Sequence, residues 1–151
     1  MIAVLRRFYR RNLCPRAKAT FFDLFECHAN LSRAIVLEET SPLAGIVTTY
    51  LWQELPEICH LVIREVNLKK KTQRTIAEHD LSKTEVANLI HRIEEAGGAS
   101  LGDFSGKVID GVFYNLCWGN PSGLVSLSIG NPQFGSERHQ RLISMLKGQA
   151  T

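Results

Sequence analysis

Apolar and polar residues alternate through much of the first half of the chain, in a pattern that is typical of β-strands. Four segments share a high content of β-branched or aromatic residues: 33–39, 46–53, 57–66 and 72–79. The stretch at 19–28 (ATFFDLFECH) is rich in aromatic residues, and we interpret it as a further strand. Turn residues at 40–45 and three lysines at 69–71 separate the segments. The pattern predicts an antiparallel sheet, built as a meander of about four or five strands.

The clearest helical pattern lies at 82–97, with the sequence SKTEVANLIHRIEEAG. Ser82 and Glu85 have the spacing of a capping box, in which two side chains satisfy backbone N–H groups at the start of a helix. Apolar residues then recur at the spacing of one helix face: Val86, Leu89, Ile90 and Ile93. Gly97 is placed to end the helix in the left-handed conformation. The segment is therefore predicted to be an amphipathic helix.

A second amphipathic helix is predicted at 136–147. Ser136 precedes it as an N-cap, and Gly148 follows it as a stop signal. Apolar residues recur between them at helical spacing, so one face of this helix can pack on the sheet. The combined pattern predicts an α+β fold, in which an antiparallel sheet meander and two amphipathic helices form a single domain.

The tripeptide Gly-Asn-Pro occurs twice, at 119–121 and 130–132, each time after an apolar run. Between the two copies, residues 125–129 alternate aliphatic side chains with serine, as in a half-buried antiparallel strand. Neither copy lies in a G-x-G-x-x-G or G-x-x-x-x-G-K-[ST] frame, which phosphate-binding loops use. Both copies are predicted to be turns, the first within a β-hairpin and the second between the last strand and the last helix.

Composition and charge divide the chain into an arm and a body. Its 151 residues, 44% hydrophobic and 22% charged, suit one soluble globular domain. No residue before Asp23 is acidic, whereas 1–22 hold six of the 18 Lys and Arg residues, which leaves 12 basic and 15 acidic side chains after them. We predict a basic arm or helix at 1–18 and a single α+β domain at 19–151. An arm of this kind is typical of segments that bind nucleic acid or anionic lipid, and its composition also fits a mitochondrial transit peptide.

Four cysteines are spread along the chain without a C-x-x-C pair, which favours free thiols in a reducing compartment. Two dipeptides, Cys27-His28 and Cys59-His60, have the residue types of a zinc site. Both lie in segments predicted to be strands, where neighbouring side chains point to opposite faces. Neither dipeptide can then direct both side chains to one ion, so we predict no metal and no cofactor.

The sequence contains residues that could act as acids or bases, but no catalytic sequence motif places them together. The sequence contains no nucleophile elbow, H-E-x-x-H motif, P-loop or kinase signature. Asp103, Asp110, His91 and His139 are of residue types that act as acids or bases. Asp110 is predicted to be a turn residue and His139 a residue of the first helical turn. The sequence therefore supplies no support for an enzyme. It also contains no apolar run near the roughly 18 to 20 residues of a membrane helix.

Residues 75–93 (TIAEHDLSKTEVANLIHRI) resemble a helix-turn-helix, with Ala77 in the first helix and a serine at the start of the second. Leu81 stands where that motif has glycine, and the interval from Ala77 to Val86 is about one residue short. Three glutamates on the second helix would repel phosphates. A nucleic-acid-binding protein that uses this segment and the basic arm is thus the alternative function.

Residues 58–148 resemble the small immunity-type proteins that are encoded beside bacterial secreted toxins. The resemblance covers the order of the secondary-structure elements and three short sequence segments: LSKTEVANLIHRIEEAGG, IDGVFYNLCW and LSIGNP...RLISML. It implies a bacterial, cytoplasmic protein that binds and blocks one toxin without catalysis and without a cofactor. Residues 1–22 have no counterpart in it.

Surfaces that bind proteins favour Trp, Tyr and Arg anchors within a polar rim. Trp52 and Trp118 lie at the ends of predicted strands, where partial exposure is plausible, and packing in the core is the other interpretation that the sequence leaves open. Glu54 and Glu57 flank Trp52 and suit a basic partner such as a nuclease toxin. We predict a protein-binding surface made of these four residues on the sheet side of the domain.

Overall fold

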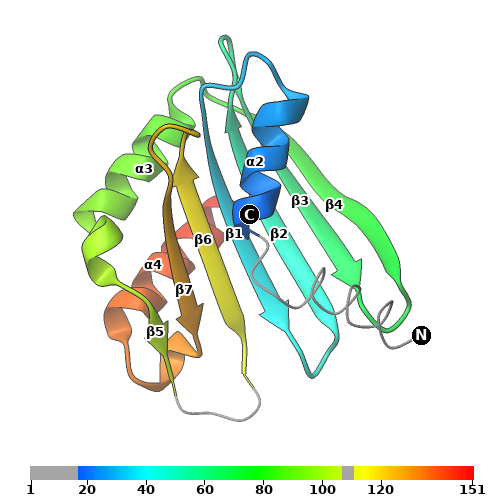
Figure 1. The fold of residues 1–151 in the computed structure, drawn as a ribbon, viewed down its shortest axis with the longest axis vertical. Coiled ribbons are helices and arrows are strands. Elements are labelled where there is room, and N and C mark those ends of the chain that lie inside the picture. The colour runs from blue at the N-terminus through cyan, green and yellow to red at the C-terminus, as the bar shows by residue number, and fades with distance from the viewer. Residues whose placement is uncertain (1–16, 107–110) are drawn as a thin grey trace.

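The computed structural model describes residues 17–106 and 111–151, which form an α+β domain around one seven-stranded sheet (Figure 1). The strands are β1 (Arg33–Ser41), β2 (Ile46–Glu54), β3 (Cys59–Asn67), β4 (Thr72–Leu81), β5 (Phe104–Ser105), β6 (Phe113–Gly119) and β7 (Val125–Gly130). Their order across the sheet is β4-β3-β2-β1-β6-β7-β5. All neighbouring strands are antiparallel except β5 and β7, which are parallel.

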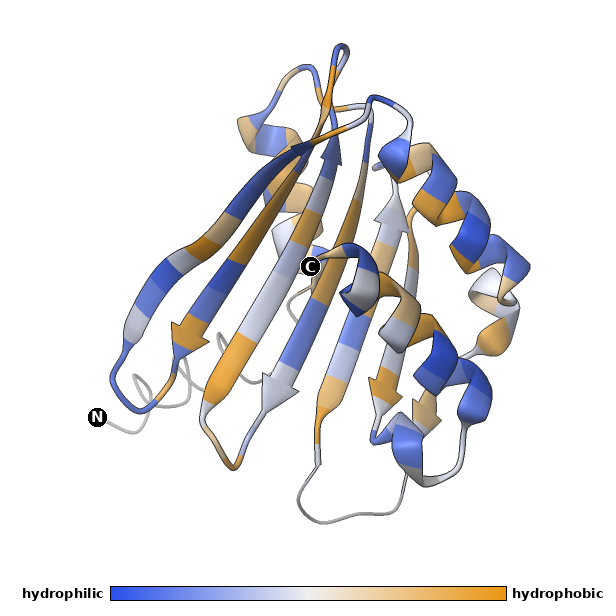
Figure 2. Ribbon diagram, turned by 180° about the vertical axis from the view of Figure 1, so that it is seen from behind, coloured by the Kyte–Doolittle hydropathy of each residue, from blue (hydrophilic) through white to orange (hydrophobic). Residues whose placement is uncertain are grey.

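Helices cover both faces of this sheet. They are α2 (Ala17–Cys27), α3 (Glu85–Glu95) and α4 (Glu137–Gln149), with short 3₁₀ helices η1 (Gly98–Leu101) and η2 (Pro132–Phe134). Helix α2 crosses one face, and α3 and α4 lie on the opposite face over the part of the sheet around β1, β6 and β7 (Figures 1 and 2). Within 17–106 and 111–151, no helix is both long enough and apolar enough to span a membrane.

The predicted strands at 33–39, 46–53, 57–66 and 72–79 are confirmed as β1 to β4. The prediction of a strand at 19–28 is wrong, because this segment lies in helix α2. The buried residues of α2 explain the helix: Ala17, Phe21 and Leu24. Their spacing of four and three residues places them on one helical face.

Two hydrophobic cores hold the domain together, one on each face of the sheet. The main core lies between the sheet and the helices α3 and α4, and it includes Ile35, Leu37 and Trp52. The second core lies under α2, where Phe21 packs with buried sheet residues such as Val36. Successive residues of β1 therefore serve opposite cores, which explains why this strand is an almost continuous apolar run.

Helix α3 begins two residues later than the capping-box pattern predicts. Its N-cap is Thr84, which makes no side-chain capping bond, and the hydroxyl of Ser82 lies 3.5 Å from that of Thr84. The predicted capping box is therefore wrong. The prediction for Gly97 is confirmed, because its φ of 126° lies in the positive region that favours glycine.

Helix α4 begins as predicted, since the hydroxyl of Ser136 accepts a hydrogen bond from the backbone N–H of His139. Gly148 does not stop it, and the helix continues to Gln149. The next residue, Ala150, is buried in the main core, so packing beyond the glycine offsets its low helix propensity.

Both Gly-Asn-Pro copies are turns, as predicted. The Asn120 side-chain oxygen accepts hydrogen bonds from the backbone N–H groups of Ser122 and Gly123. Gly119 is required because a Cβ there would lie 2.2 Å from the carbonyl oxygen of Gly123. In the second copy, Asn131 adopts the left-handed conformation between β7 and η2. These copies shape the chain and do not form a phosphate cradle.

Candidate protein-binding surface

The two tryptophans lie in the main core. Trp52 is 0% exposed and Trp118 is 3% exposed. Ile35 of β1 is in register with both of them, so the three side chains form one row across the centre of the sheet. Of the two interpretations that the sequence left open, the structure shows packing in the core, because α3 and α4 cover this row. Neither indole can contact a partner while the core is intact.

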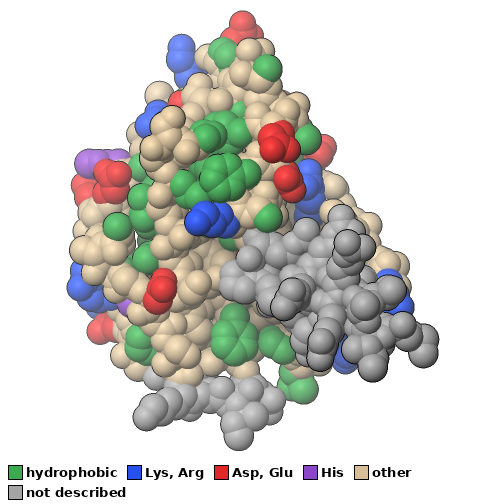
Figure 3. All heavy atoms as spheres, in the orientation of Figure 1, with side chains coloured by type: hydrophobic (Ala, Val, Ile, Leu, Met, Phe, Trp, Pro, Cys, Tyr) green, Lys and Arg blue, Asp and Glu red, His purple; other side chains and the backbone are tan. Residues whose placement is uncertain are grey.

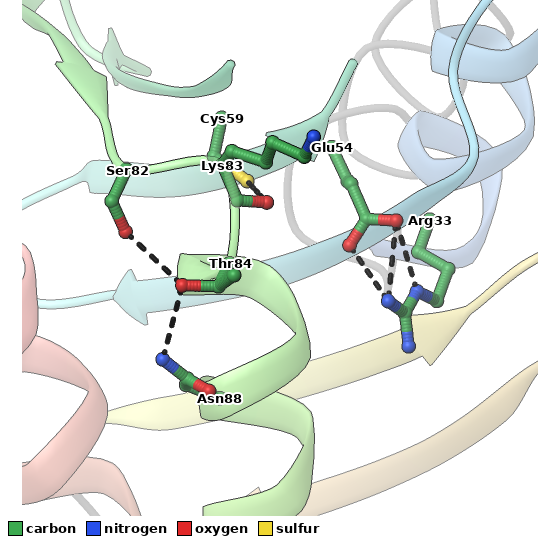
Figure 4. Close-up of polar contacts among 7 residues, drawn as sticks. All are labelled: Arg33, Glu54, Cys59, Ser82, Lys83, Thr84 and Asn88. Carbon is green, nitrogen blue, oxygen red and sulfur yellow. Dashed lines mark hydrogen bonds and ion pairs between the residues drawn. The ribbon is translucent and has the colours of Figure 1, made fainter. Parts of the chain in front are cut away.

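The structure places Glu54 and Glu57 in different surroundings. The Glu54 carboxylate accepts three hydrogen bonds from Arg33, from Nη2 to Oε2 at 2.8 Å and from Nη2 and Nε to Oε1 at 3.2 Å each (Figure 4). Its side chain is only 16% exposed. Glu57 is exposed in the turn between β2 and β3. The four predicted residues therefore do not form one surface, and Arg33 balances much of the acidic charge expected there.

A different part of the sheet remains accessible. At the end of the sheet near the turns after β1 and β3, strands β2, β3 and β4 extend beyond α3 and α4 (Figure 2). Farther along the same face, Trp52 of β2 and Leu61 of β3 lie in the main core. We call the accessible surface the open face, defined by Thr48, Tyr50, Glu65, Arg74 and His79. Thr48, Glu65 and Arg74 are in register across the three strands. Tyr50 lies between Thr48 and Trp52 on the same face of β2.

The open face has an aromatic centre. The rings of Tyr50 and Trp52 are stacked with centroids 6.1 Å apart. Tyr50 is half-buried and packs, together with Ala77, against the main core. Beside it, Arg74 and Glu65 form an ion pair at 3.2 Å in which the arginine is 72% exposed. A partner could therefore contact an aromatic ring and a charged rim on the same strands.

An internal cluster supports the open face where it meets α4. Lys147 Nζ lies 2.6 Å from Glu39 Oε2 and 6.0 Å from the centre of the Tyr114 ring. Burial, followed by the negative charge of Glu39, raises the pKa of Tyr50. The same two causes, in the same order, raise the pKa of Tyr114 well above its ordinary value. Both phenols are neutral at physiological pH and are suited to hydrogen bonding.

The candidate acid–base residues have separate structural roles. His139 is buried, with Nε2 2.9 Å from the carbonyl oxygen of Gly102 and its ring stacked on Phe104. His91 is exposed on α3, with Nε2 2.8 Å from Oε1 of Glu95. The Asp103 carboxylate accepts a hydrogen bond from the backbone N–H of Ser128. Asp110 lies outside the described residues.

The part of the chain that the structure describes contains no group of three or more His, Cys, Asp or Glu residues that could hold a metal. Cys27 is exposed on α2, whereas Cys59 is buried in β3 and its thiol lies 3.4 Å from the carbonyl oxygen of Lys83 (Figure 4). The two Cys-His dipeptides therefore differ in both element and burial. The strand-based reason for separating Cys27 from His28 does not apply to this helical segment.

The helix-turn-helix hypothesis is wrong. Its first helix would occupy residues that form β4, where His60 Nδ1 of β3 also contacts the Asp80 carboxylate at 2.9 Å. Only the second helix exists, as α3, and its apolar face packs on the sheet. The predicted arm at 1–18 lies almost wholly outside the described residues, so its proposed binding to nucleic acid stays a prediction.

The opposite face of the sheet has a cavity of about 390 Å³ near the starts of β6 and β5. Its lining includes Phe104, Phe113, Asn115 and Ser128. The hydroxyl of Ser128 donates to the side-chain oxygen of Asn115 at 3.0 Å, so these two polar groups satisfy each other. The same face shows hydrophobic side chains over α2 (Figure 3), where Phe22 is 39% exposed.

No protein-family model, curated protein or solved structure matches the chain. Tyr50 and Arg74 are the main residues that the sequence analysis missed as candidates for the open face. One signal was present, because Tyr50 is two residues from Trp52 on the same strand and shares its face.

Proposed function

We propose that the chain is a protein-binding module of the immunity type, which inhibits a toxin partner by covering part of its surface with the open face. The observation that carries this proposal is the incomplete cover of the sheet by α3 and α4, which leaves Tyr50 accessible. Most soluble domains bury the apolar face of a sheet, so a partly exposed aromatic ring there favours an interface.

The residue types of the open face support the proposal. Tyr and Arg are the side chains that most often anchor protein interfaces, and Tyr50 and Arg74 lie on adjacent parts of one sheet. The Arg74–Glu65 and Lys147–Glu39 pairs supply a polar rim. Because these side chains project from strands, binding would cost little ordering of the backbone.

The charge of the domain supports a basic partner. After residue 22 the chain has 12 basic and 15 acidic side chains, a net charge of -3. Glu57 is exposed in the turn between β2 and β3, and Glu78 and Asp80 are exposed on the face of β4 opposite to the open face. Opposite charge on a toxin would accelerate association and select against other partners. A bacterial cytoplasm is the compartment in which such an inhibitor protects its own cell.

The test compares Tyr50→Ala with Phe22→Ala, which removes an exposed ring from α2 on the opposite face. Each full-length variant is used as bait in the native host, and the captured protein is identified and expressed with it in a growth assay. Loss of an interface anchor costs about 2 to 4 kcal/mol, so Tyr50→Ala should weaken the complex roughly 30-fold or more. Phe22→Ala should bind and protect like the wild type.

Melting curves of both variants separate a binding defect from unfolding. A captured toxin that Tyr50→Ala neutralises as well as the wild type would rule out the open face as the inhibitory surface. Equal loss of binding in both variants would point to the α2 face or to general destabilisation. Capture of a protein whose activity the chain does not inhibit would refute the immunity-type role.

A further inference from the structure

The face of the sheet that carries α2 has two parts. Helix α2 lies over the half of the sheet where β1 begins (Figure 1). There its buried side chains share the second core with one row of sheet residues, Val36, Leu51 and Val62, which are in register across β1, β2 and β3. Two further rows follow toward the end of β1: Glu38, Thr49 and Arg64, then Thr40, Val47 and Val66. No member of these two rows belongs to either hydrophobic core.

The β1 and β2 residues of these rows are nevertheless buried. Glu38 is 4% exposed, Thr40 is 3% exposed and Val47 is 5% exposed. Neighbouring strands flank a side chain only within the plane of the sheet, so burial to this degree requires a further layer above the face. No described helix extends over the row of Thr40 and Val47 (Figure 1). Another segment must therefore cover it.

The chemistry of the two rows indicates what the covering segment contains. Val47 and Val66 lie side by side and form an apolar patch. Glu38 places a carboxylate next to them, and a buried carboxylate is stable only beside cations or hydrogen-bond donors. On the same face of β4, Glu78 and Asp80 add negative charge. The covering segment should therefore combine apolar and basic side chains.

The sequence of residues 1–16 has this composition. Ile2, Leu5 and Phe8 recur at helical spacing, and the segment contains five arginines and no acidic residue. It joins the described structure at Ala17, which is buried in the second core on the same face. The two rows span about 10 Å from β1 to β3, because neighbouring strands are about 4.8 Å apart. Sixteen residues reach about 24 Å even as a helix, which is enough to cross them.

We propose that residues 1–16 pack across β1, β2 and β3 on the α2-bearing face, with apolar side chains on Val47 and Val66 and arginines beside Glu38. The occupant is this segment because it is attached at Ala17, on the same face. Such a tether gives a local concentration of the order of mM without a second molecule. The inference goes beyond the proposed function and does not depend on it, since this face is opposite to the open face.

The first test follows cleavage of the full chain by chymotrypsin, which cuts after aromatic residues such as Phe8 and Tyr9. Proteolysis of a docked segment tracks the fraction of molecules in which that segment is detached. Cleavage at these two sites should therefore be at least about tenfold slower in the full chain than in a synthetic peptide of residues 1–16. Equal rates in the chain and the peptide would overturn the proposal.

Two adjacent threonines of β2 supply a matched pair of variants. Thr49 is in register with Glu38 on the α2-bearing face, whereas Thr48 lies on the open face. Thr49→Lys places a cation beside Glu38, where it competes with the arginines of the arm, and should accelerate cleavage at Phe8 and Tyr9 about tenfold. Thr48→Lys makes the same change of charge on the same strand and should leave these rates unchanged. Equal rates in the two folded variants would contradict the proposal.

A spin label near the start of the chain locates the arm without any change to the face, so it covers the case in which Thr49→Lys does not fold. The label is attached through Ala3→Cys in a chain that also carries Cys14→Ala and Cys27→Ala, because Cys59 and Cys117 are buried. NMR signals of β2 and β3 should be broadened more than those of α3 and α4, which lie on the opposite face. Broadening centred on α3 and α4, or of no described element, would overturn the proposal.

Other partners of the arm are distinguished by the same cleavage assay. A DNA duplex or vesicles that contain phosphatidylserine are added to the wild-type chain, since both present phosphate groups to the arginines. An arm that resists chymotrypsin without either addition supports docking on the sheet. An arm that is cleaved like the free peptide until one of them is added would assign it to nucleic acid or to lipid, and would refute the proposal.

Discussion

At position 52 an indole ring is fully buried, and its Nε1 has no hydrogen-bond partner among the described residues. Trp52→Ala should lower the free energy of unfolding by about 3 to 5 kcal/mol, because it leaves a large cavity. Trp52→Phe should cost less than about 1.5 kcal/mol, since it keeps an aromatic ring and removes the unpaired N–H. Urea denaturation monitored by circular dichroism measures both. A wild-type midpoint for Trp52→Ala would contradict its place in the core.

Two buried ionisable residues predict a loss of stability at alkaline pH. Burial, with a smaller contribution from Glu38, raises the pKa of the Cys117 thiol from 9.0 to about 12, and burial and Glu39 raise the pKa of Tyr114. Between pH 9 and 12, the unfolded chain therefore releases protons that the folded chain retains. The contribution of these two groups to the free energy of unfolding should be constant below this interval and fall as the pH rises through it.

Denaturation curves from about pH 8 to 11 measure this slope. Cys117→Ala should reduce the alkaline loss, because it removes one of the groups that ionise only in the unfolded chain. Cys27→Ala is the control, since Cys27 is exposed. Equal slopes for Cys117→Ala and the wild type would show that the thiol does not contribute.

At the scale of single elements, the two predicted helix caps differ in the structure although their sequences look alike. Ser136 is the N-cap of α4 and accepts a hydrogen bond from the backbone of His139, whereas Ser82 precedes α3 without capping it. Ser136→Ala should lower the free energy of unfolding by about 1 kcal/mol. Ser82→Ala should change it by less than about 0.5 kcal/mol. Thermal or urea unfolding compares them, and equal effects would contradict this assignment.

At the scale of the whole molecule, the sheet has a protected centre and one long open edge. Strand β1 pairs on both sides, with β2 and β6, and has helices above both faces. Its amide hydrogens should exchange only through global unfolding, whereas those of β4 should exchange faster. Hydrogen exchange followed by NMR tests this, and protection of β4 equal to that of β1 would contradict it.

The elements with strong local patterns could be predicted from the sequence. Alternation identified the segments of β1 to β4, and the i, i+3, i+4, i+7 spacing from Val86 to Ile93 identified α3. Helix α2 was missed although its pattern was also local. The predicted boundary between the basic arm and the domain, at residue 18, lies inside this helix. Ala17 was therefore assigned to the arm and Phe21 and Leu24 to the domain, although the three residues share one helical face. Aromatic content then favoured a strand.

The candidate surface could not be predicted in this way, because exposure depends on pairing between distant segments. By itself, the sequence determined the strands other than the two-residue β5 and two of the three described helices, since each follows from side chains that are close along the chain. Only the tertiary structure decided that β1 pairs with β6, which brings Ile35 beside Trp118 under two helices. The same arrangement leaves Tyr50 only half-buried, because α3 and α4 do not extend over the whole width of the seven-stranded sheet.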